Sequence, residues 1–323
     1  MTAWLVRAVG VLLIFTALAI ALSRAPDVPV QGLVARWAPP PSDFIDVKGM
    51  ALHVRDEGPR DDPLPIVLLH GTGSSLHTWE GWVKALKGQR RVVSFDMPGF
   101  GLTGPFVGQY VKTGAPDDYS GDAYARFVLD VLDTLKLPRV VLGGNSLGGE
   151  VAWRTASLAP ERVAALVLVD SSGLAFTPES IPLGFMLARL PVVGRISEWL
   201  LPREVIEQSV ASVYGDASRI KPELVERYFE LTLREGNRRA LRQRIRQLEQ
   251  EMGHGSERLA RLTQPTLILW GGRDRLIPPA VGEQLAQAIP GSQRVVFPAL
   301  GHVPHEEDPA ATVVPVKVFL GLR

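Results

Sequence analysis

The 323-residue sequence contains no cysteine. This absence excludes disulfide bonds, thiolate metal sites and cysteine nucleophiles. The chain also has no excess of one charge, because 35 basic and 34 acidic residues leave a formal net charge of +1 at pH 7. Without a basic block, we expect no nucleic-acid partner. Hydrophobic residues make up 46% of the chain, which is ample for a packed core in one large domain or two smaller ones.

Two further absences narrow the chemistry. No two of the six histidines stand four residues apart, the spacing of a helical zinc pair, so we expect no metal and no cofactor. The glycine-rich stretch 143–149 has no lysine after its second glycine, which excludes a phosphate-binding loop.

Residues 8–23 carry no charge, and Arg7 and Arg24 bracket this stretch. The 16 uncharged residues fall just short of the roughly 17 to 25 needed to span a membrane, and adding residues 4–6 with a snorkelling Arg7 reaches that length. We expect residues 1–23 to anchor the chain in a membrane, with the catalytic body outside the cytoplasm. The alternatives are a cleaved signal peptide with secretion and a buried core segment. Residues 24–42, which include Pro39-Pro40-Pro41, predict an extended linker.

Short apolar runs alternate with helical patterns from residue 44 onward. A hairpin is expected over 44–55, and a helix is expected over 120–137. Buried-type strand runs follow the hairpin at 66–69, 91–96, 140–142, 163–169, 265–270 and 294–297. This alternation predicts an α/β fold with a mainly parallel, twisted, eight-stranded sheet covered by helices on both faces.

The run 140–142 leads into Gly144-x-Ser146-x-Gly148, and a helix-like stretch follows. This is the spacing of a nucleophile elbow, which holds a serine on a strained strand-to-helix turn between small residues. The alternative is a glycine-rich turn whose serine only caps the helix.

Candidate partners for Ser146 follow two later strand runs. Asp274 comes just after 265–270, and His302 follows Gly301 after 294–297. Histidine, with a pKa of about 6.5, can take a proton from serine near neutrality, and a buried carboxylate orients the imidazole. Asp170 is the rival acid, with capping of its loop as its expected role, and His305 is the rival base. We expect His53, His77 and His254 to be surface or structural residues.

These segments together resemble the α/β-hydrolase fold superfamily from about residue 43 to the end of the chain. The resemblance rests on 70–73, on Asp96-Met97-Pro98-Gly99-Phe100-Gly101, on 144–149, and on the order Ser146, Asp274, His302. It implies an oxyanion hole made by the backbone N–H groups of Thr72 and Leu147, with Gly73 as the neighbouring alternative. It also implies that His70 orients the oxyanion loop.

Strand patterns stop between residues 172 and 251, where helical periodicity takes over. In the family that the chain resembles, such an insertion forms a cap over a core, here 43–171 and 252–323. The basic run from Arg238 to Glu249 is expected to be a solvated helix face. Five residues are candidates either to line an apolar pocket or to form the core of the cap: Phe185, Met186, Leu187, Trp199 and Tyr228.

The sequence predicts a serine hydrolase that acts on a small-molecule ester-like substrate through an acyl-enzyme. Asn145 makes the elbow resemble that of carbon–carbon bond hydrolases of ring-cleavage products, although Val303-Pro304 stands where those enzymes carry an aromatic residue. The pattern is also compatible with a cofactor-free perhydrolase and, more remotely, with a non-catalytic ligand-binding protein. Dehalogenases and epoxide hydrolases of this fold use an aspartate where this chain has Ser146.

Overall fold

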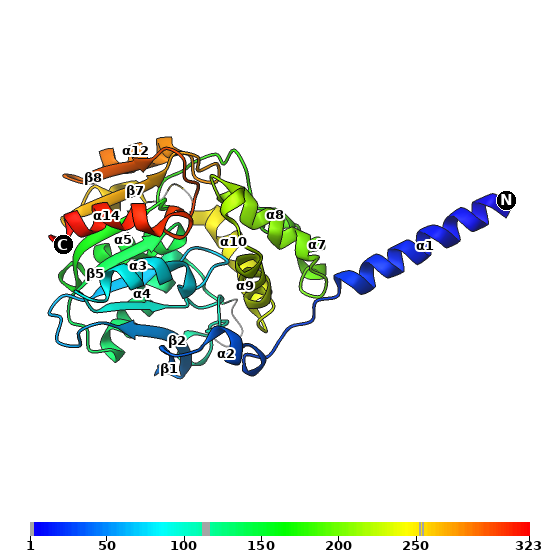
Figure 1. The fold of residues 1–323 in the computed structure, drawn as a ribbon, viewed down its shortest axis with the longest axis horizontal. Helices are drawn as coiled ribbons and strands as arrows, with labels where there is room; N and C mark the ends of the chain where they lie inside the picture. The colour runs from blue at the N-terminus through cyan, green and yellow to red at the C-terminus, as the bar shows by residue number, and fades with distance from the viewer. Residues whose placement is uncertain (1–2, 112–116, 252, 254) are drawn as a thin grey trace.

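The computed structural model describes residues 3–111, 117–251, 253 and 255–323, and Figure 1 shows their arrangement. Its centre is an eight-stranded sheet in the order β1-β2-β4-β3-β5-β6-β7-β8. The strands are β1 (Ser42–Val47), β2 (Met50–Glu57), β3 (Ile66–Leu69), β4 (Val92–Phe95), β5 (Val140–Asn145), β6 (Val163–Val169), β7 (Thr266–Gly271) and β8 (Gln293–Phe297). The predicted α/β sheet is confirmed, including its opening hairpin.

Strands β3 to β8 pair in parallel, whereas β2 is antiparallel to both β1 and β4. Every residue of β3, β4 and β5 is buried, as expected for strands covered on both faces. The register pairs Leu69 with Gly144, Asn145 with Val169, and Val169 with Leu269. The loops that follow β3, β5, β6 and β7 therefore emerge side by side at one edge of the sheet.

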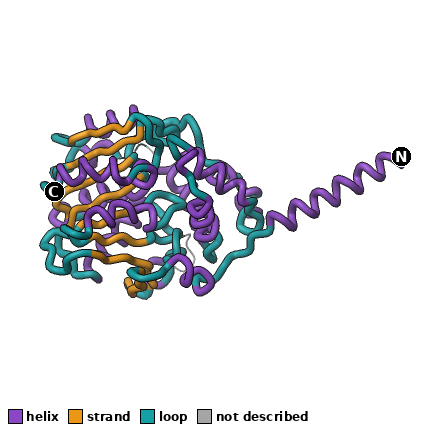
Figure 2. Tube along the Cα trace, viewed as in Figure 1, coloured by secondary structure: helices purple, strands orange, loops and turns teal. Residues whose placement is uncertain are grey.

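Helices cover both faces of the sheet (Figure 2). Side chains of α3 and α14 join one hydrophobic cluster with the sheet, and those of α4, α5, α11 and α12 join another. The bounds of these helices, and of the short α13 that precedes α14, are α3 (Glu80–Leu86), α4 (Gly121–Thr134), α5 (Leu147–Leu158), α11 (Ser256–Leu259), α12 (Pro279–Ala288), α13 (Pro304–Glu307) and α14 (Pro309–Phe319). Ser120 caps α4 by accepting a hydrogen bond from the N–H of Ala123 at 3.2 Å.

Five of the described helices between β6 and β7 form a group, and Figure 1 shows α7 to α10 of this group gathered beside the sheet. They are α6 (Leu183–Arg189), α7 (Val193–Ile196), α8 (Arg203–Val213), α9 (Pro222–Thr232) and α10 (Asn237–Glu251). We call this group the cap helices. The buried Val205, Val210 and Val225 hold α8 and α9 together in a hydrophobic cluster of their own.

The solvated face expected for the arginines of α10 is wrong for three of them. Arg238, Arg242 and Arg244 expose only 4%, 13% and 1% of their side chains. They pair with Asp27, with Glu198, and with Glu150 and Glu251, respectively. A charged stripe predicts the solvent-exposed face of a helix only when one face of that helix is free. Helix α10 has no such free face here, because it packs between the core and two segments outside the core.

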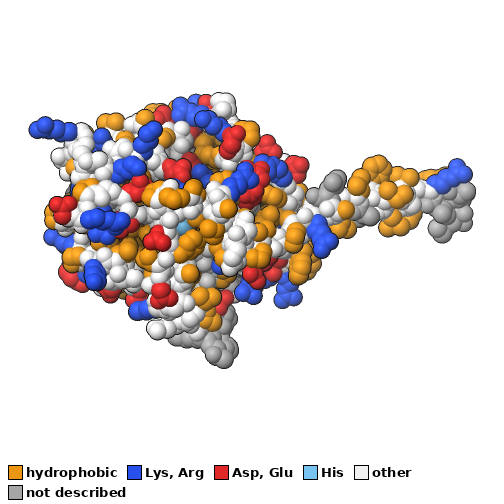
Figure 3. Space-filling view, turned by 60° about the horizontal axis from the view of Figure 1, so that its bottom comes forward, with side chains coloured by type: hydrophobic (Ala, Val, Ile, Leu, Met, Phe, Trp, Pro, Cys, Tyr) orange, Lys and Arg blue, Asp and Glu red, His pale blue; other side chains and the backbone are white. Residues whose placement is uncertain are grey.

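The structure does not support the membrane anchor predicted for the N-terminal segment. Helix α1 (Ala3–Ser23) projects away from the body with exposed apolar side chains (Figures 1 and 3). In the part of the chain that the structure describes, no helix is long and apolar enough to cross a membrane. The predicted membrane anchor at residues 1–23 is therefore not supported.

Residues 24–42 are not an extended linker either. They contain α2 (Gln31–Trp37), and Ala25 and Leu33 are buried. Backbone bridges join Arg24 to Leu200 and Val28 to Arg234. This segment is therefore packed against the cap helices, because its few apolar residues find partners there despite the prolines.

Candidate active site

Ser146 sits on a strained turn between β5 and α5. Its backbone has φ 55° and ψ −116°, a conformation that costs about 1–3 kcal/mol for a non-glycine residue. Its N–H donates to the carbonyl of Val169 at 3.0 Å. A Cβ at Gly144 would lie 2.2 Å from the Gly148 carbonyl, and a Cβ at Gly148 would lie 2.2 Å from the carbonyl oxygen of Leu69. Only glycine fits at either position, as the elbow spacing predicts.

The helix-capping alternative for this serine is wrong. Among the described residues, the Ser146 side chain makes no capping hydrogen bond to α5. Leu147 is the first residue of α5, so its N–H has no partner within the helix. The N-terminus of α5 therefore offers a free backbone donor and a favourable dipole beside the serine.

His302 and Asp274 form a buried pair. The imidazole Nδ1 of His302 lies 2.7 Å from Oδ2 of Asp274, and the two residues are 5% and 2% exposed. Because a carboxylate only accepts, Nδ1 carries the hydrogen and Nε2 is left to accept a proton. The other oxygen of Asp274 accepts from the N–H groups of Leu276 and Ile277, both at 2.9 Å. The imidazole and the two backbone groups together fix the orientation of the Asp274 carboxylate.

The loop after β3 is set by His70. Its Nδ1 donates to the carbonyl of Gly71 at 2.7 Å, and its Nε2 accepts from the N–H of Met97 at 2.9 Å. Burial lowers the pKa of His70, so it remains neutral in these bonds. A Cβ at Gly71 would lie 2.9 Å from Oδ1 of Asn145. The loop therefore passes directly over the elbow, which brings Thr72 to the same edge as Ser146.

Core and cap enclose a cavity of about 170 Å³ above the elbow. Thr72, Ser146, Leu147 and His302 line its floor. Its walls are mostly apolar and come from the cap helices, with Leu187, Val205, Ile206, Leu241, Ile245 and Leu248 among them. A cavity with apolar walls and a few convergent polar groups is the usual form of a small-molecule site.

The candidate cap residues divide into two groups. Phe185, Leu187 and Tyr228 line the cavity. Met186 and Trp199 are outside its lining and are 45% and 70% exposed. All five stand in helical patterns of similar hydrophobicity, so the sequence has no signal that separates the two groups.

A family model described as alpha/beta hydrolase fold matches residues 65–309. The chain belongs to the alpha/beta hydrolase family. The resemblance found in the sequence is therefore confirmed, and the chain is a hydrolase.

Several known hydrolases are similar to it. The 2-hydroxy-6-oxononadienedioate/2-hydroxy-6-oxononatrienedioate hydrolase of Cupriavidus pinatubonensis is 30% identical over 298 residues, covering 87% of this chain and 95% of that protein. A meta-cleavage product hydrolase from Pseudomonas fluorescens IP01 superposes with a TM-score of 0.71 at 24% identity, covering 86% of this chain and 97% of that one. A thermophilic esterase from Thermogutta terrifontis gives the same TM-score at 26% identity, covering 86% and 98%.

His305 lies apart from the cavity of this alpha/beta hydrolase. It is fully buried, and its ring packs on Trp79 with centroids 4.0 Å apart. Neither ring nitrogen has a hydrogen-bond partner among the residues that the structure describes. Burial and the nearby His302 and His70 hold its pKa well below the usual range. His305 is therefore a neutral core residue in a position unsuited to act as the base.

The remaining described histidines are buried, and sequence reasoning missed the network that they form. His53 Nδ1 contacts Oδ2 of Asp96 at 2.7 Å, and its Nε2 contacts Oγ of Ser42 at 3.0 Å. This series of bonds has the atom order of a catalytic triad, but Oγ of Ser42 also accepts from Nε of Arg55 at 2.9 Å. His77 bonds to the Trp37 carbonyl at 2.8 Å, and His254 lies outside the described residues.

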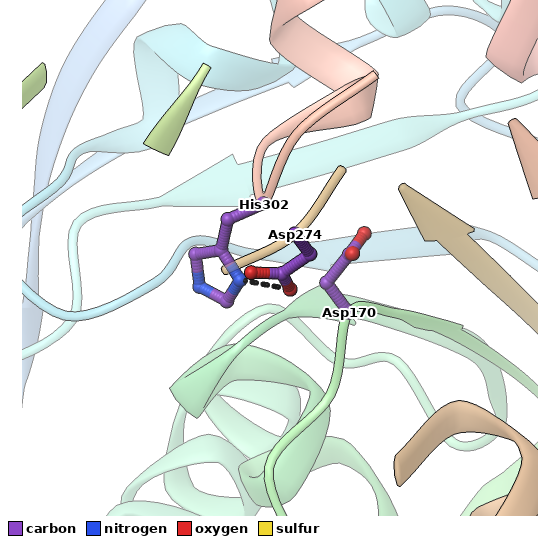
Figure 4. A group of neighbouring side chains, drawn as sticks. All are labelled: Asp170, Asp274 and His302. Carbon is purple, nitrogen blue, oxygen red and sulfur yellow. Dashed lines mark hydrogen bonds and ion pairs between the residues drawn. The ribbon is translucent and has the colours of Figure 1, made fainter. Parts of the chain in front are cut away.

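Asp170, Asp274 and His302 are the one group in the described ranges whose donor atoms could hold a metal ion, with one atom of each within 4.8 Å of the others (Figure 4). Their existing bonds do not fit that role. His302 Nδ1 is committed to Asp274, Asp274 accepts two N–H groups, and Oδ1 of Asp170 accepts from the N–H of Gly271 at 2.9 Å. A metal ion needs several ligand atoms that are not already hydrogen-bonded. Of the carboxylate oxygens in this group, these bonds leave Oδ2 of Asp170 available to a metal ion.

Proposed function

We propose that the chain is a serine hydrolase that cleaves an ester-like carbonyl through an acyl-enzyme. Ser146 attacks the carbonyl carbon, and Nε2 of His302 takes the proton from its Oγ. Asp274 holds the imidazole in the required tautomer and stabilises the imidazolium. The observation that carries this proposal is the buried 2.7 Å pair of His302 and Asp274, whose imidazole lines the same cavity as the strained Ser146.

The negative charge that develops on the carbonyl oxygen needs donors that are already in place. We assign this role to the N–H groups of Leu147 and Thr72, both of which belong to cavity-lining residues. One such donor is worth about 10²–10³ in kcat. His302 then returns its proton to the leaving alcohol, and water attacks the acyl-enzyme with His302 again acting as the base.

The cavity walls indicate the class of substrate. They are largely apolar, and the two arginines among them, Arg238 and Arg244, already pair with Asp27 and with Glu150 and Glu251. Because these charges are compensated, an uncharged apolar acyl group fits the site better than a dianion. The cap, which we place at residues 172–251 over a core of 43–171 and 252–323, would set the acyl-chain length.

Carbon–carbon bond hydrolysis is a second candidate. The relative from Cupriavidus pinatubonensis is named for a dienedioate substrate and matches 87% of this chain, and Asn145 precedes the serine as in the elbow of such enzymes. The same serine, histidine and aspartate would serve that reaction. The pairing of Arg238 and Arg244 with carboxylates favours ester hydrolysis over this second candidate, since a dicarboxylate substrate needs unpaired cations to bind its charges.

Esterase assays on p-nitrophenyl esters of rising chain length test the first proposal. Ser146→Ala should lower kcat by several orders of magnitude, about 10⁶ in the analogous protease case. Ser42→Ala is the matched control, because Ser42 also contacts a histidine that contacts an aspartate, yet it lies outside the cavity lining. A fluorophosphonate should label the wild type and the control but not Ser146→Ala.

Near wild-type esterase activity in Ser146→Ala would refute the proposal. Turnover of a vinylogous 1,5-diketone without turnover of simple esters would instead support carbon–carbon bond hydrolysis. Failure of both labelling and hydrolysis at every chain length would favour a non-catalytic binding protein.

A further inference from the structure

Asp170 occupies a constrained position that the proposed mechanism does not use. It follows the last residue of β6, and its backbone has a positive φ of 43°. Its Oδ1 accepts from the N–H of Gly271, the last residue of β7, at 2.9 Å. Its side chain therefore bridges the ends of two neighbouring strands, directly beside the loop that carries Asp274.

Asp170 lies in buried, acidic surroundings. It is fully buried, and Figure 4 shows Asp274 between it and the imidazole of His302. A carboxylate oxygen of Asp170, one of Asp274 and a ring nitrogen of His302 all lie within 4.8 Å of one another. The other acidic group that acts on Asp170 is Glu307 of α13, whose oxygens accept from the N–H groups of Gly215, Asp216 and Gly301.

Two ionised carboxylates this close in a buried site repel each other, and one proton between them removes that repulsion. The negative charge is better stabilised on Asp274 than on Asp170, because Asp274 accepts hydrogen bonds from His302 and from two backbone N–H groups. Asp170 accepts from one N–H group at Oδ1, and no N–H group of the described residues donates to its Oδ2. Burial and the charge of Asp274 raise the pKa of Asp170 well above its usual range.

We propose that Asp170 is a positioning residue that carries a proton on Oδ2 and donates it in a hydrogen bond to the carboxylate of Asp274. Asp170 lies outside the cavity lining and acts only through Asp274. The bond holds the Asp274 carboxylate in place against His302. It also draws charge from that carboxylate, so the imidazolium of His302 is less stabilised than it would be beside Asp274 alone.

Two substitutions of Asp170 distinguish the effect of its hydrogen-bond donor from the effect of its side-chain volume. Asp170→Asn keeps the shape, and because the N–H of Gly271 selects the amide oxygen, the NH₂ group faces Asp274 as a donor. Asp170→Gly removes the donor, and glycine adopts the φ of 43° without strain. The kinetic part of this test rests on the proposed function, since it reads the titration of His302 in ester hydrolysis.

The pH profile of kcat/KM should distinguish the two variants. We expect Asp170→Gly to raise the apparent pKa of the base by about half a unit to one unit, and Asp170→Asn to leave it within about 0.2 units. A role in packing alone would lower the activity of both variants without moving the pKa. An unchanged pKa in Asp170→Gly, or an equal shift in both variants, would overturn the proposal.

Infrared spectroscopy of the resting protein tests the proton directly and needs no catalysis. The wild type at neutral pH should show the C=O band of a protonated carboxylic acid, and Asp170→Asn should lose it. Absence of a band that depends on Asp170 overturns the proposal, whatever the esterase assays give. If the band is present but Ser146 proves unreactive, the proposed function fails and the protonated Asp170 stands. Should Asp170→Gly fail to fold, the infrared comparison with Asp170→Asn still decides.

Discussion

The side-chain Nδ2 of Asn145 donates to the backbone carbonyl of His302 at 2.9 Å and also contacts the carbonyl of Val169 at 3.2 Å. The residue before the proposed nucleophile thus holds the loop that carries the proposed base. Its other polar side-chain atom, Oδ1, lies against the oxyanion loop at Gly71. The buried side-chain amide of Asn145 therefore contacts three loops at the same edge of the sheet, which explains structurally why an asparagine stands before Ser146.

Asn145→Ala should release the His302 loop. A displacement of about 1 Å can cost about 10²-fold in rate, so we expect kcat/KM for a p-nitrophenyl ester to fall by about 10- to 100-fold. Asn237→Ala is a matched control, because Nδ2 of Asn237 also donates to two carbonyls, those of Gly101 and Leu231, away from the elbow. Both variants should lose similar stability in thermal unfolding. Equal activity losses in the two would contradict the positioning role of Asn145.

His302 and His305 can be separated by one substitution each. His302→Phe should abolish ester hydrolysis, whereas His305→Phe should retain most of it. Because both ring nitrogens of His305 are buried without a described partner, phenylalanine should also stabilise the fold by about 1–3 kcal/mol. Steady-state kinetics and thermal unfolding of the two variants check this. Loss of activity in a folded His305→Phe would reopen the choice of base.

The sequence predicted most of the fold because its signals are local. Apolar runs and the glycines around Ser146 each act over a few residues, and the structure confirms the sheet that the apolar runs indicate. The order of Ser146, Asp274 and His302 also placed all three beside neighbouring strand ends. The parallel register shows in addition that the strand ends lie side by side, since Leu69 pairs with Gly144 and the next residue, Asn145, pairs with Val169.

Contacts between distant segments escaped prediction. The hydrogen-bonded series of Ser42, His53 and Asp96 joins three separate elements, and none of its spacings is characteristic. The arginines of α10 looked solvated because carboxylate partners such as Asp27 and Glu150 lie 94 or more positions away in the chain. Asp170 seemed a loop cap because nothing in its neighbourhood in the sequence reveals that Asp274 lies beside it. Export of the chain stays a prediction.

The cap helices are joined to the segment that follows His302 by a buried ion pair between Arg227 of α9 and Glu306 of α13, with side-chain exposures of 11% and 7%. The hydroxyl of Tyr228 also donates to Glu306 at 2.9 Å and lies 3.3 Å from Oγ of Ser74, next to the oxyanion loop. Removing one partner of a buried pair costs about 3–5 kcal/mol. We therefore expect Arg227→Met to loosen the cap and raise KM several-fold for long-chain esters.

The pair of Arg203 and Glu226 provides the control for this change, because it joins α8 to α9 within the cap and is more exposed. Arg203→Met should leave KM close to wild type. Limited proteolysis should cut the cap of Arg227→Met faster than that of Arg203→Met. Identical KM values in the two variants would show that the buried pair does not set the cap position.

Stability should fall in mild acid because His77 is buried and neutral. Burial lowers the pKa of His77 to about 4, and its ring bonds to the Trp37 carbonyl and to Ser75. Between about pH 6.5 and pH 4 the unfolded chain binds a proton at His77 that the folded chain does not. The free energy of unfolding therefore decreases by about 1.4 kcal/mol per pH unit as the pH falls through this window.

His77→Gln removes this titration while its amide can still donate to the Trp37 carbonyl. At pH 7 the free energy of unfolding, measured by urea titration, should be larger for the wild type than for the variant. On acidification to pH 4.5 it should decrease by a smaller amount in the variant than in the wild type. His70 and His305 are neutral in both proteins and contribute equally, so the difference between the two slopes isolates His77. Parallel slopes for wild type and variant would mean that folding does not lower the pKa of His77.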